Sequence, residues 1–346
     1  MVRASPQLAM TAALQLSVLD QSVARAGLPH DQSIRDTVAL AEHCEALGYR
    51  RFWLSEHHSL PTIVGTAPEV LMAAIAARTR RIRIGSAGVM LPHYAPLKVA
   101  EQFRVLDALA PGRIDLGVGR APGSDRRTAM LLNPDPRASD RFPQQVLELQ
   151  AWLGGRPWPE GHPAHGIQAL PLAATAPDVW MLGSSDYGAQ LAAHLGLPYA
   201  FAHFITDGEG AEQALDLYRN TFKPGAIAQP HSALCVWALA ADTEDEAWHL
   251  FASRERARLD RNLGRFGALL PPDEAVREYS EAELAYRAQL RRKAMVGTGE
   301  QVATRLSALA AELQVQEIVV ITWTWDAQAQ RRSYELLAEA MGMPRS

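Results

Sequence analysis

Short apolar runs alternate with longer stretches of helical spacing along the whole chain. Such near-continuous apolar runs are typical of strands buried on both faces of a parallel sheet, and each parallel step needs a crossover that a helix can supply. The predicted strands are residues 13–20, 51–56, 81–88, 113–120, 178–184, 198–204, 233–240 and 317–324. The predicted helices are 33–48, 66–79, 96–109, 138–153, 186–196, 208–222, a long one from 243, and 327–341. This α/β order predicts a (β/α)8 TIM barrel.

A doubly wound open sheet is the alternative fold, and it usually carries a G-x-G-x-x-G turn after its first strand. The nearest match here is "GVGRAPG" at 117–123, which follows the fourth strand and has its third glycine one residue late. We therefore expect residues 1–346 to form one barrel domain, with insertions at 154–177 before strand five and at 258–300 before strand eight. The second insertion is either a lid over the catalytic face or a helical hairpin with a solvated, charged surface.

Composition narrows the classes of partner. The chain has 346 residues, 48% of them hydrophobic, and a net charge of −4 without a long basic cluster, which argues against nucleic acid or lipid headgroups as partners. Its two cysteines, Cys44 and Cys235, exclude a disulfide framework and a cysteine-based zinc site. No run approaches the roughly 18 apolar residues of a membrane span. We expect a cytoplasmic protein.

Polar or small residues stand at the ends of most predicted strands, where barrel enzymes place their chemistry. The second strand runs into "SEHH", with His57 and His58 adjacent. Side chains alternate along a strand, so these two histidines point apart and cannot readily grip one ion. No H-E-x-x-H is present, and we expect no metal; a metal-dependent barrel hydrolase is the least favoured alternative. One histidine is expected to face the pocket while the other packs beside it.

Two further stretches suggest a phosphate-bearing ligand with a planar ring. Arg120 follows "LGVG", and Gly183, Ser184 and Ser185 precede a helix that starts near Asp186. Free N–H groups and hydroxyls at a helix start suit a phosphate, although Ser and Asp are also ordinary helix caps. The small residues at 86–88 leave room either for a planar ring or for close helix packing.

These residues resemble the bacterial-luciferase-like flavin-dependent monooxygenases. The likeness is densest in "AEHCEALGYRRFWLSEHHS" and in "TAPEVLMAAIAARTRRIRIGSAGVMLPHYAPLKVAEQFRVLDALAPGRIDLGVGRAPG". It resumes at "LGSSDYGAQLAAHLGLPYAFAHF" and, more weakly, at "VGTGEQVATRLSALAAELQVQEIVV". Together these stretches cover well over half of the chain in the family's order.

The resemblance implies a barrel that binds FMN as FMNH2, supplied by a separate NAD(P)H-dependent flavin reductase. The reduced flavin activates O2 as a C4a-hydroperoxide that oxidises a small organic substrate. It implies that His57 is the active-site histidine and that Ala87 and Gly88 pass under the flavin ring through a cis peptide. It also implies that Glu101 lies near the ring. The phosphate is expected to lie among Gly183, Ser184, Ser185, Arg120 and Arg141.

The chain departs from luciferase at three positions, which puts light emission and an aldehyde substrate in doubt. It has Gly119 in place of a reactive cysteine, Gly183 in place of a glutamate and Tyr187 in place of a threonine. Two alternatives stay open: a deazaflavin-dependent hydride-transfer oxidoreductase on the same fold, and a flavin-binding protein without turnover. The resemblance also implies a homodimer, formed through the helices at 66–79 and 96–109.

Overall fold

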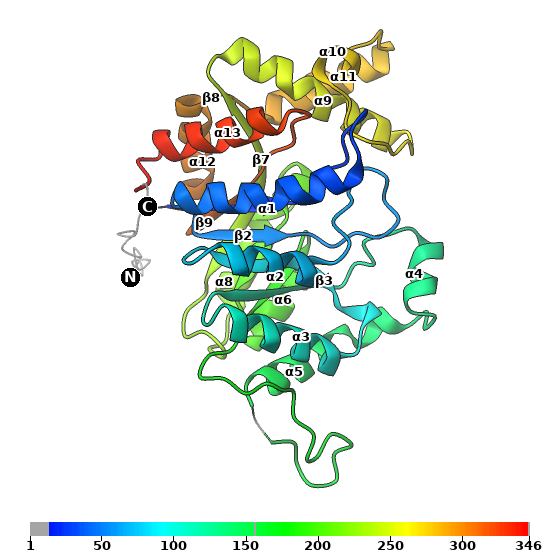
Figure 1. The fold of residues 1–346 in the computed structure, drawn as a ribbon, viewed down its shortest axis with the longest axis vertical. Helices are drawn as coiled ribbons and strands as arrows, with labels where there is room; N and C mark the ends of the chain where they lie inside the picture. The colour runs from blue at the N-terminus through cyan, green and yellow to red at the C-terminus, as the bar shows by residue number, and fades with distance from the viewer. Residues whose placement is uncertain (1–13, 156, 345–346) are drawn as a thin grey trace, which may run out of the picture.

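Eight parallel strands close into a barrel in the computed structural model, which describes residues 14–155 and 157–344 (Figure 1). The barrel strands are β1 (Gln15–Asp20), β2 (Arg51–Leu54), β3 (Arg83–Met90), β4 (Ile114–Gly119), β5 (Asp178–Gly183), β6 (Tyr199–Phe201), β7 (Ser232–Ala241) and β9 (Glu317–Ile321). Neighbours in the chain pair from β1 to β7, and β9 closes the ring between β7 and β1. The predicted TIM barrel is confirmed, and all eight predicted strands form.

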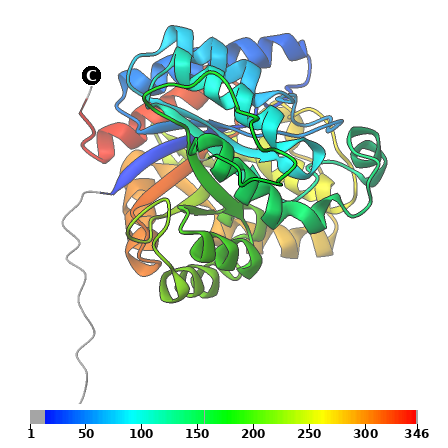
Figure 2. The same ribbon diagram turned by 90° about the horizontal axis from the view of Figure 1, so that it is seen from below.

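Helices surround the barrel, as Figure 2 shows from below. The crossover helices are α1 (His30–Ala46), α2 (Pro68–Arg78), α3 (Pro96–Leu109), α5 (Phe142–Leu153), α6 (Asp186–Leu195), α8 (Ala211–Thr221), α9 (Glu244–Asn262), α12 (Gly299–Glu312) and α13 (Ala327–Ala340). Shorter or inserted elements are η1 (Leu91–His93), α4 (Arg126–Leu132), η2 (Ala138–Arg141), α7 (His203–Thr206), α10 (Pro272–Ala275) and α11 (Glu281–Lys293). The predicted helices form within a few residues of their expected bounds, although the one at 138–153 begins as the 3-10 turn η2.

The two faces of the strands form two separate apolar layers. Trp53, Trp180 and Val319 belong to the cluster that fills the barrel interior. Side chains on the opposite faces, such as Phe52 and Val320, pack in the larger layer beneath the helices. Burial on both faces explains why the strands read as continuous apolar runs in the sequence.

An ion network fills the end of the barrel where the strands begin. Arg51 donates from Nη1 to Asp115 Oδ2 at 2.8 Å and from Nε to Glu317 Oε1 at 2.9 Å. Trp53 Nε1 also donates to Asp115 Oδ2, at 2.9 Å. The carboxylates of Asp115 and Glu317 are fully buried. Because these side chains occupy the interior there, we expect ligands to enter from the opposite end, at the C-terminal ends of the strands.

A ninth strand, β8 (Met295–Thr298), lies within the second insertion. It pairs in parallel with the last four residues of β7, from Ala238 to Ala241. We predicted no strand in 258–300, and that prediction was wrong. The stretch "MVGT" has only four residues and contains a glycine, so it shows no strand pattern of its own; the exposed edge at the end of the long β7 makes it a strand.

The second insertion covers the C-terminal ends of the first two strands. Leu269 exchanges backbone hydrogen bonds with Ala24 and Ala26 in the loop after β1. Thr62, in the loop after β2, donates its hydroxyl to Gly267 O at 2.8 Å. The helices of the insertion lie together near the top of Figure 1, where Glu255 on α9 accepts hydrogen bonds from two arginines of α11. The second insertion therefore contains packed helices, as the hairpin alternative expected, and also reaches over the catalytic face, as the lid alternative expected.

The first insertion, at 154–177, lies at the other end of the barrel. It connects α5 to β5, and a connection from a helix to the next strand lies opposite the catalytic face. Thr175 donates its hydroxyl to Asp107 Oδ2 at 2.6 Å, near the end of α3. Figure 1 shows this segment projecting from the bottom of the molecule. Within residues 14–155 and 157–344, no helix has the length and apolar character needed to span a bilayer.

Candidate active site

The "EHH" residues lie in the loop after β2, because that strand ends at Leu54 rather than at the predicted residue 56. The loop is tied to the one after β4 through Gly123, whose carbonyl accepts from His58 N at 3.3 Å. Gly123 has a φ of +59°, and a Cβ there would lie 2.1 Å from Met90 Cε. The positive φ and the close approach of Met90 favour glycine at this position.

His57 is partly buried and keeps one ring nitrogen available. Its Nδ1 lies 3.2 Å from Gly123 O. Since a carbonyl oxygen only accepts, Nδ1 carries the hydrogen and donates, and Nε2 holds a lone pair. Burial lowers the pKa of His57 below its ordinary value of 6.5, and the charge of Arg261 on α9 lowers it further. The ring is therefore neutral at neutral pH, in the form that can accept a proton.

His58 belongs to a different hydrogen-bonded cluster, centred on the Glu56 carboxylate. Glu56 is 2% exposed and accepts from His58 Nε2 at 2.7 Å and from Tyr94 OH at 2.6 Å. Its second oxygen accepts from Met90 N at 3.1 Å. Burial and the neighbouring Glu56 raise the pKa of Tyr94, so its hydroxyl keeps its proton. His58 therefore anchors the loop to the end of β3, whereas His57 Nδ1 lies against Gly123 O. That one of the two histidines faces the pocket stays a prediction.

Tyr94 and Glu56 are residues whose roles the sequence did not reveal. Glu56 could be noted only as a carboxylate at a strand end, and Tyr94 follows the third strand without any motif. Their contact joins residues 38 positions apart. No local pattern reports such a contact, because it depends on how β2 and β3 sit side by side.

The small residues at 86–88 lie within β3, which continues to Met90 rather than ending at the predicted residue 88. The peptide bond between Ala87 and Gly88 is cis, as the resemblance implies. A Cβ at Gly88 would lie 2.4 Å from Leu182 Cδ1 and 2.8 Å from Gly117 O, so a larger residue does not fit. Ser86 Oγ donates to Gly117 O at 2.8 Å and ties β3 to β4 at this level. The Leu182 side chain and the Gly117 backbone therefore lie beside Gly88.

Arg120 and the start of α6 come together through Tyr187. The Arg120 guanidinium lies over the Tyr187 ring, 3.8 Å from its centroid. Among the residues that the structure describes, Arg120 has no carboxylate within 4.0 Å. Tyr187 was noted in the sequence only as a departure from luciferase; in the structure it orients the arginine. A stacked, exposed guanidinium retains its hydrogen-bond donors for an anion.

Ser185 caps α6 without using its side chain. Its backbone is extended, and its hydroxyl makes no capping hydrogen bond to the first turn of the helix. Tyr199 OH donates to Ser185 O at 3.3 Å, and Gly183 O accepts from Ala202 N at 2.8 Å, which positions the turn. The helix start at Asp186 is the one predicted. Its first N–H groups and the Ser184 and Ser185 hydroxyls are suited to an anion.

The two remaining predicted residues lie on other elements. Glu101 is partly exposed in the second turn of α3. Arg141 is exposed in η2, where its Nη2 lies 3.0 Å from Asp135 Oδ2. The structure gives Arg141 this acid partner rather than a free guanidinium. Across residues 14–155 and 157–344, no group of three or more His, Cys, Asp or Glu side chains could hold a metal ion.

The fold and its polar mouth define a parallel β/α barrel with a candidate ligand site at the C-terminal ends of its strands. A model of the luciferase-like monooxygenase family matches residues 14–317. The chain belongs to this family and is, like its named relatives, an enzyme of the oxygenase class.

Similar proteins span nearly the whole chain. YwcH of Bacillus subtilis, an uncharacterised protein, is 46% identical and covers 94% of this chain and 99% of its own. A luciferase-like monooxygenase of Escherichia coli K12 is 40% identical, with 93% and 96% covered. The N-acetyl-S-alkylcysteine monooxygenase of B. subtilis is 36% identical, with 95% and 98% covered.

Solved structures share the fold. The crystal structure of apo-MsnO8 is 35% identical and superposes with a TM-score of 0.87, covering 96% of this chain and 100% of its own. Two more distant barrels carry cofactors. The oxygenating constituent of 3,6-diketocamphane monooxygenase from Pseudomonas putida was solved with FMN (17% identity, TM-score 0.69, 95% and 98% covered). An F420-dependent secondary alcohol dehydrogenase holds an F420-acetone adduct (14% identity, TM-score 0.67, 96% and 100% covered).

Proposed function

We propose that this protein is an FMN-dependent monooxygenase, a single barrel domain over residues 1–346, that uses FMNH2 and O2 to oxidise a small organic substrate. The observation that carries the proposal is Arg120: an exposed guanidinium, stacked on Tyr187 3.8 Å from the ring centroid, beside a helix start whose N-cap hydroxyl is not used for capping. A cation next to free N–H groups suits one phosphate group.

The residues at the mouth fit a flavin mononucleotide. Its phosphate would be held by Arg120, Ser184, Ser185 and the turn at Gly183. Ala87 and Gly88 would lie against its ring, beside the Leu182 side chain. Glu101 would lie nearer the ring.

Arg141 would be a second cation at the phosphate. Its exposed pair with Asp135 contributes only about 0–1 kcal/mol, as surface ion pairs do. The arginine could therefore exchange that carboxylate for a phosphate at little cost.

His57 would move the proton that the reaction requires. When bound, reduced flavin supplies the electrons that activate O2. The His57 Nε2 lone pair can accept a proton because burial keeps the ring neutral, and the hydrogen bond from Nδ1 to Gly123 O holds the ring in place. The second insertion, through Gly267 and Leu269, would restrict water at the mouth.

A separate NAD(P)H-dependent flavin reductase would supply FMNH2. The sequence lacks a G-x-G-x-x-G turn after its first strand, which argues against tight dinucleotide binding by this chain. The FMN-bound neighbour is itself described as one constituent of its monooxygenase. The F420-dependent neighbour keeps a deazaflavin hydride-transfer enzyme as the second candidate.

Anaerobic titration with FMN, FMNH2 and riboflavin tests the proposal. Wild type should bind FMNH2, and Arg120→Ala should weaken FMN and FMNH2 binding by about 10- to 100-fold, the usual range for a lost charge-assisted hydrogen bond. Riboflavin, which lacks the phosphate, should bind both proteins equally. Tight binding of F420 with none of FMNH2 would overturn the assignment in favour of the deazaflavin enzyme.

An oxygen-consumption assay separates an enzyme from a protein that only binds flavin. FMNH2-loaded protein should consume O2 and oxygenate a substrate, and N-acetyl-S-alkylcysteines are the first compounds to screen because a 36% identical relative is named for them. Tight FMNH2 binding without oxygenated product from any substrate would favour the non-catalytic alternative.

We also infer that the protein is a homodimer joined through α2 and α3. The two helices are neighbours, since Gln102 Nε2 on α3 lies 3.4 Å from Glu69 Oε1 on α2. Val70, Val105 and Leu109 are 65%, 50% and 61% exposed on these helices. Neighbouring exposed apolar side chains mark a surface suited to burial in an interface.

A further inference from the structure

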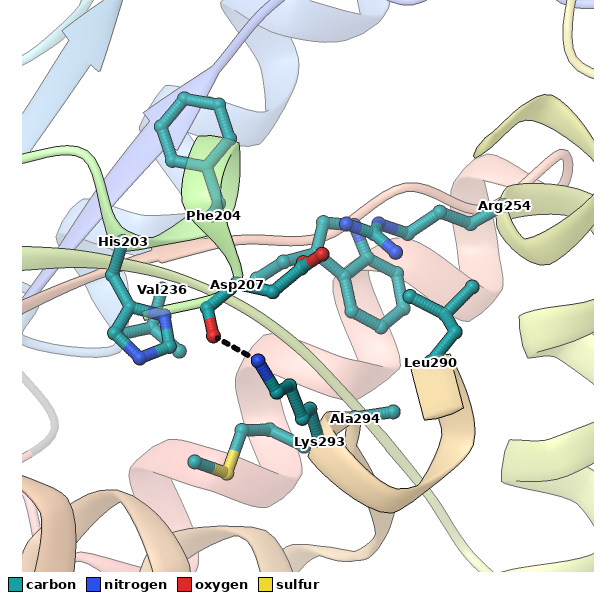
Figure 3. A pocket seen from close by; sticks show the side chains of 10 residues that line it. His203, Phe204, Asp207, Val236, Arg254, Leu290, Lys293 and Ala294 are labelled. Carbon is teal, nitrogen blue, oxygen red and sulfur yellow. Dashed lines mark hydrogen bonds between the residues drawn. The ribbon is translucent and has the colours of Figure 1, made fainter. Parts of the chain in front are cut away.

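A small cavity of about 30 Å³ lies between α7, α9, α11 and the middle of β7 (Figure 3). None of the residues proposed to hold the flavin lines it. Its wall combines apolar Phe204 and Leu290 with polar His203, Asp207, Arg254 and Lys293. A wider hollow of about 500 Å³ shares His203, Asp207 and Lys293 with it, so a small ligand can reach the cavity from solvent.

Arg254 is buried in the wall of this cavity without an acidic partner. The residue is 7% exposed, and within the described part of the chain no carboxylate lies within 4.0 Å of its guanidinium. The Arg254 guanidinium stacks on the Trp237 ring, with its carbon 4.1 Å from the ring centroid. Burial and the nearby charge of Arg258 lower the pKa of Arg254 to about 9, although the charge of Asp207 acts in the opposite direction. A buried cation without a counter-ion is costly and is usually paired.

Trp237 provides a second unsatisfied donor in the same wall. Its Nε1 is buried, and among the residues that the structure describes it has no hydrogen-bond partner. A buried indole N–H ordinarily finds an acceptor. An acceptor atom inside the cavity would satisfy both Trp237 and Arg254.

Positive charge exceeds negative charge around the cavity. Arg254, Arg258 and Arg261 recur at helical spacing on α9, and Lys293 approaches from α11, as Figure 3 shows for Arg254 and Lys293. Asp207 is the carboxylate in the wall, and it already pairs with Arg258 Nη2 at 2.8 Å. Lys293 donates to the main-chain oxygen of Asp207 at 3.3 Å rather than to its carboxylate. One acid therefore faces several cations.

We propose that this cavity binds the carboxylate group of a small organic anion, with Arg254 as its ionic partner and Trp237 Nε1 as a second donor. Because about 10–15 Å³ admits one water, the cavity has room for two or three atoms of that size, as a carboxylate requires. A guanidinium fork matches the two carboxylate oxygens. The rest of the anion would extend toward the wider hollow lined by His203, Asp207 and Lys293. The inference does not depend on the flavin proposal.

Titration with acetate, followed by tryptophan fluorescence, tests this site, since Trp237 lies in its wall. At constant ionic strength acetate should give a saturable change, whereas acetamide, a neutral molecule of the same shape, should give none. Arg254→Gln should weaken acetate binding by about 10- to 100-fold. Arg256→Gln is the matched control: Arg256 lies on the same helix, pairs with Asp260 at 2.6 Å and does not line the cavity.

The proposal is overturned if acetate and acetamide act alike, or if Arg254→Gln binds acetate as wild type does. Circular dichroism shows whether that variant folds. Should it not fold, Arg254→Lys decides, because it keeps the charge in the wall but removes the guanidinium fork. Unchanged acetate affinity in Arg254→Lys then overturns the proposal, and a several-fold loss supports it.

Steady-state kinetics distinguish the two sources of the carboxylate. If the anion is the substrate's own carboxylate, acetate raises the KM for that substrate and leaves kcat unchanged. If it is a separate organic acid, acetate binds saturably without changing that KM. With a raised KM or an unchanged KM, Arg254 is still the residue that pairs with the carboxylate. Neither result depends on which residues hold the flavin phosphate.

Discussion

At the scale of single residues, the two neighbouring histidines differ because their surroundings differ. His58 donates to a buried carboxylate, while His57 donates to a backbone oxygen and retains the Nε2 lone pair. The loop beyond Leu54, rather than the alternation of a strand, separates their directions. The contrast yields a prediction that concerns His57 alone.

His57→Ala should lower turnover by about 10²–10⁴-fold, the usual contribution of a positioned general acid or base. Burial lowers the pKa of His57, so the ring stays neutral to lower pH than a free histidine, and activity that needs the neutral ring should fall only below about pH 6.5. The pH dependence of kcat/KM measures this fall in activity at low pH. His249→Ala on the surface of α9 is the control; a similar loss there, or an unchanged profile in His57→Ala, would contradict the assignment.

At the scale of elements, buried ion pairs join strands that are distant in sequence. Asp115 on β4 accepts from Arg51 on β2 at 2.8 Å and from Arg83 on β3 at 2.6 Å. Burial alone would raise the pKa of Glu317 on β9, but hydrogen bonding to His231 and the charge of Arg51 outweigh it and lower the pKa to about 2. Each member of this network depends on the others for its counter-charge.

Asp115→Asn should lower the free energy of unfolding by about 3–5 kcal/mol, because it removes the buried carboxylate that Arg51 and Arg83 share at the barrel base and leaves them only Glu317 and the exposed Asp178. Asp178→Asn is the matched control: Asp178 also pairs with Arg83, but its side chain is 62% exposed, so the loss should stay below about 1 kcal/mol. Denaturant unfolding measures both variants. Equal losses would show that burial does not govern this network.

At the scale of the whole molecule, the two ends of the barrel differ in structure. Side chains close the base, where the strands begin. The mouth, where the strands end, carries the loops, the small residues 86–88 of β3 and the second insertion. The sides are covered by helices, and α2 and α3 expose apolar residues toward solvent. A partner subunit would cover that surface and leave the mouth accessible.

Val105→Arg on α3 should convert the dimer to a monomer, since a charge at the centre of an apolar interface is left unpaired on association. Sedimentation velocity or light scattering measures the mass. Leu131→Arg on α4 is the control, because Leu131 is more exposed, at 81%, but lies on a different surface. A monomeric wild type would refute the interface.

Local patterns in the sequence by themselves determined the eight barrel strands, most crossover helices and the start of α6 at Asp186. Each of these elements follows from residues close together in the chain: apolar runs for the strands, helical spacing for the helices, and Ser or Asp before a helix for its start. The resemblance to a known family pointed to Ala87 and Gly88, and their peptide bond is cis. Cofactor roles for these residues remain predictions for the titrations to check.

Only the tertiary structure decided which insertion reaches the mouth, that Met295–Thr298 forms a strand, and which histidine is held by Glu56. It also decided that Tyr187 stacks on Arg120 and that, within residues 14–155 and 157–344, no carboxylate lies within 4.0 Å of the Arg254 guanidinium. The physical reason is the same in each case. These features are contacts between residues far apart in the chain, and their energies depend on the packing of neighbouring strands and helices, which no local pattern records.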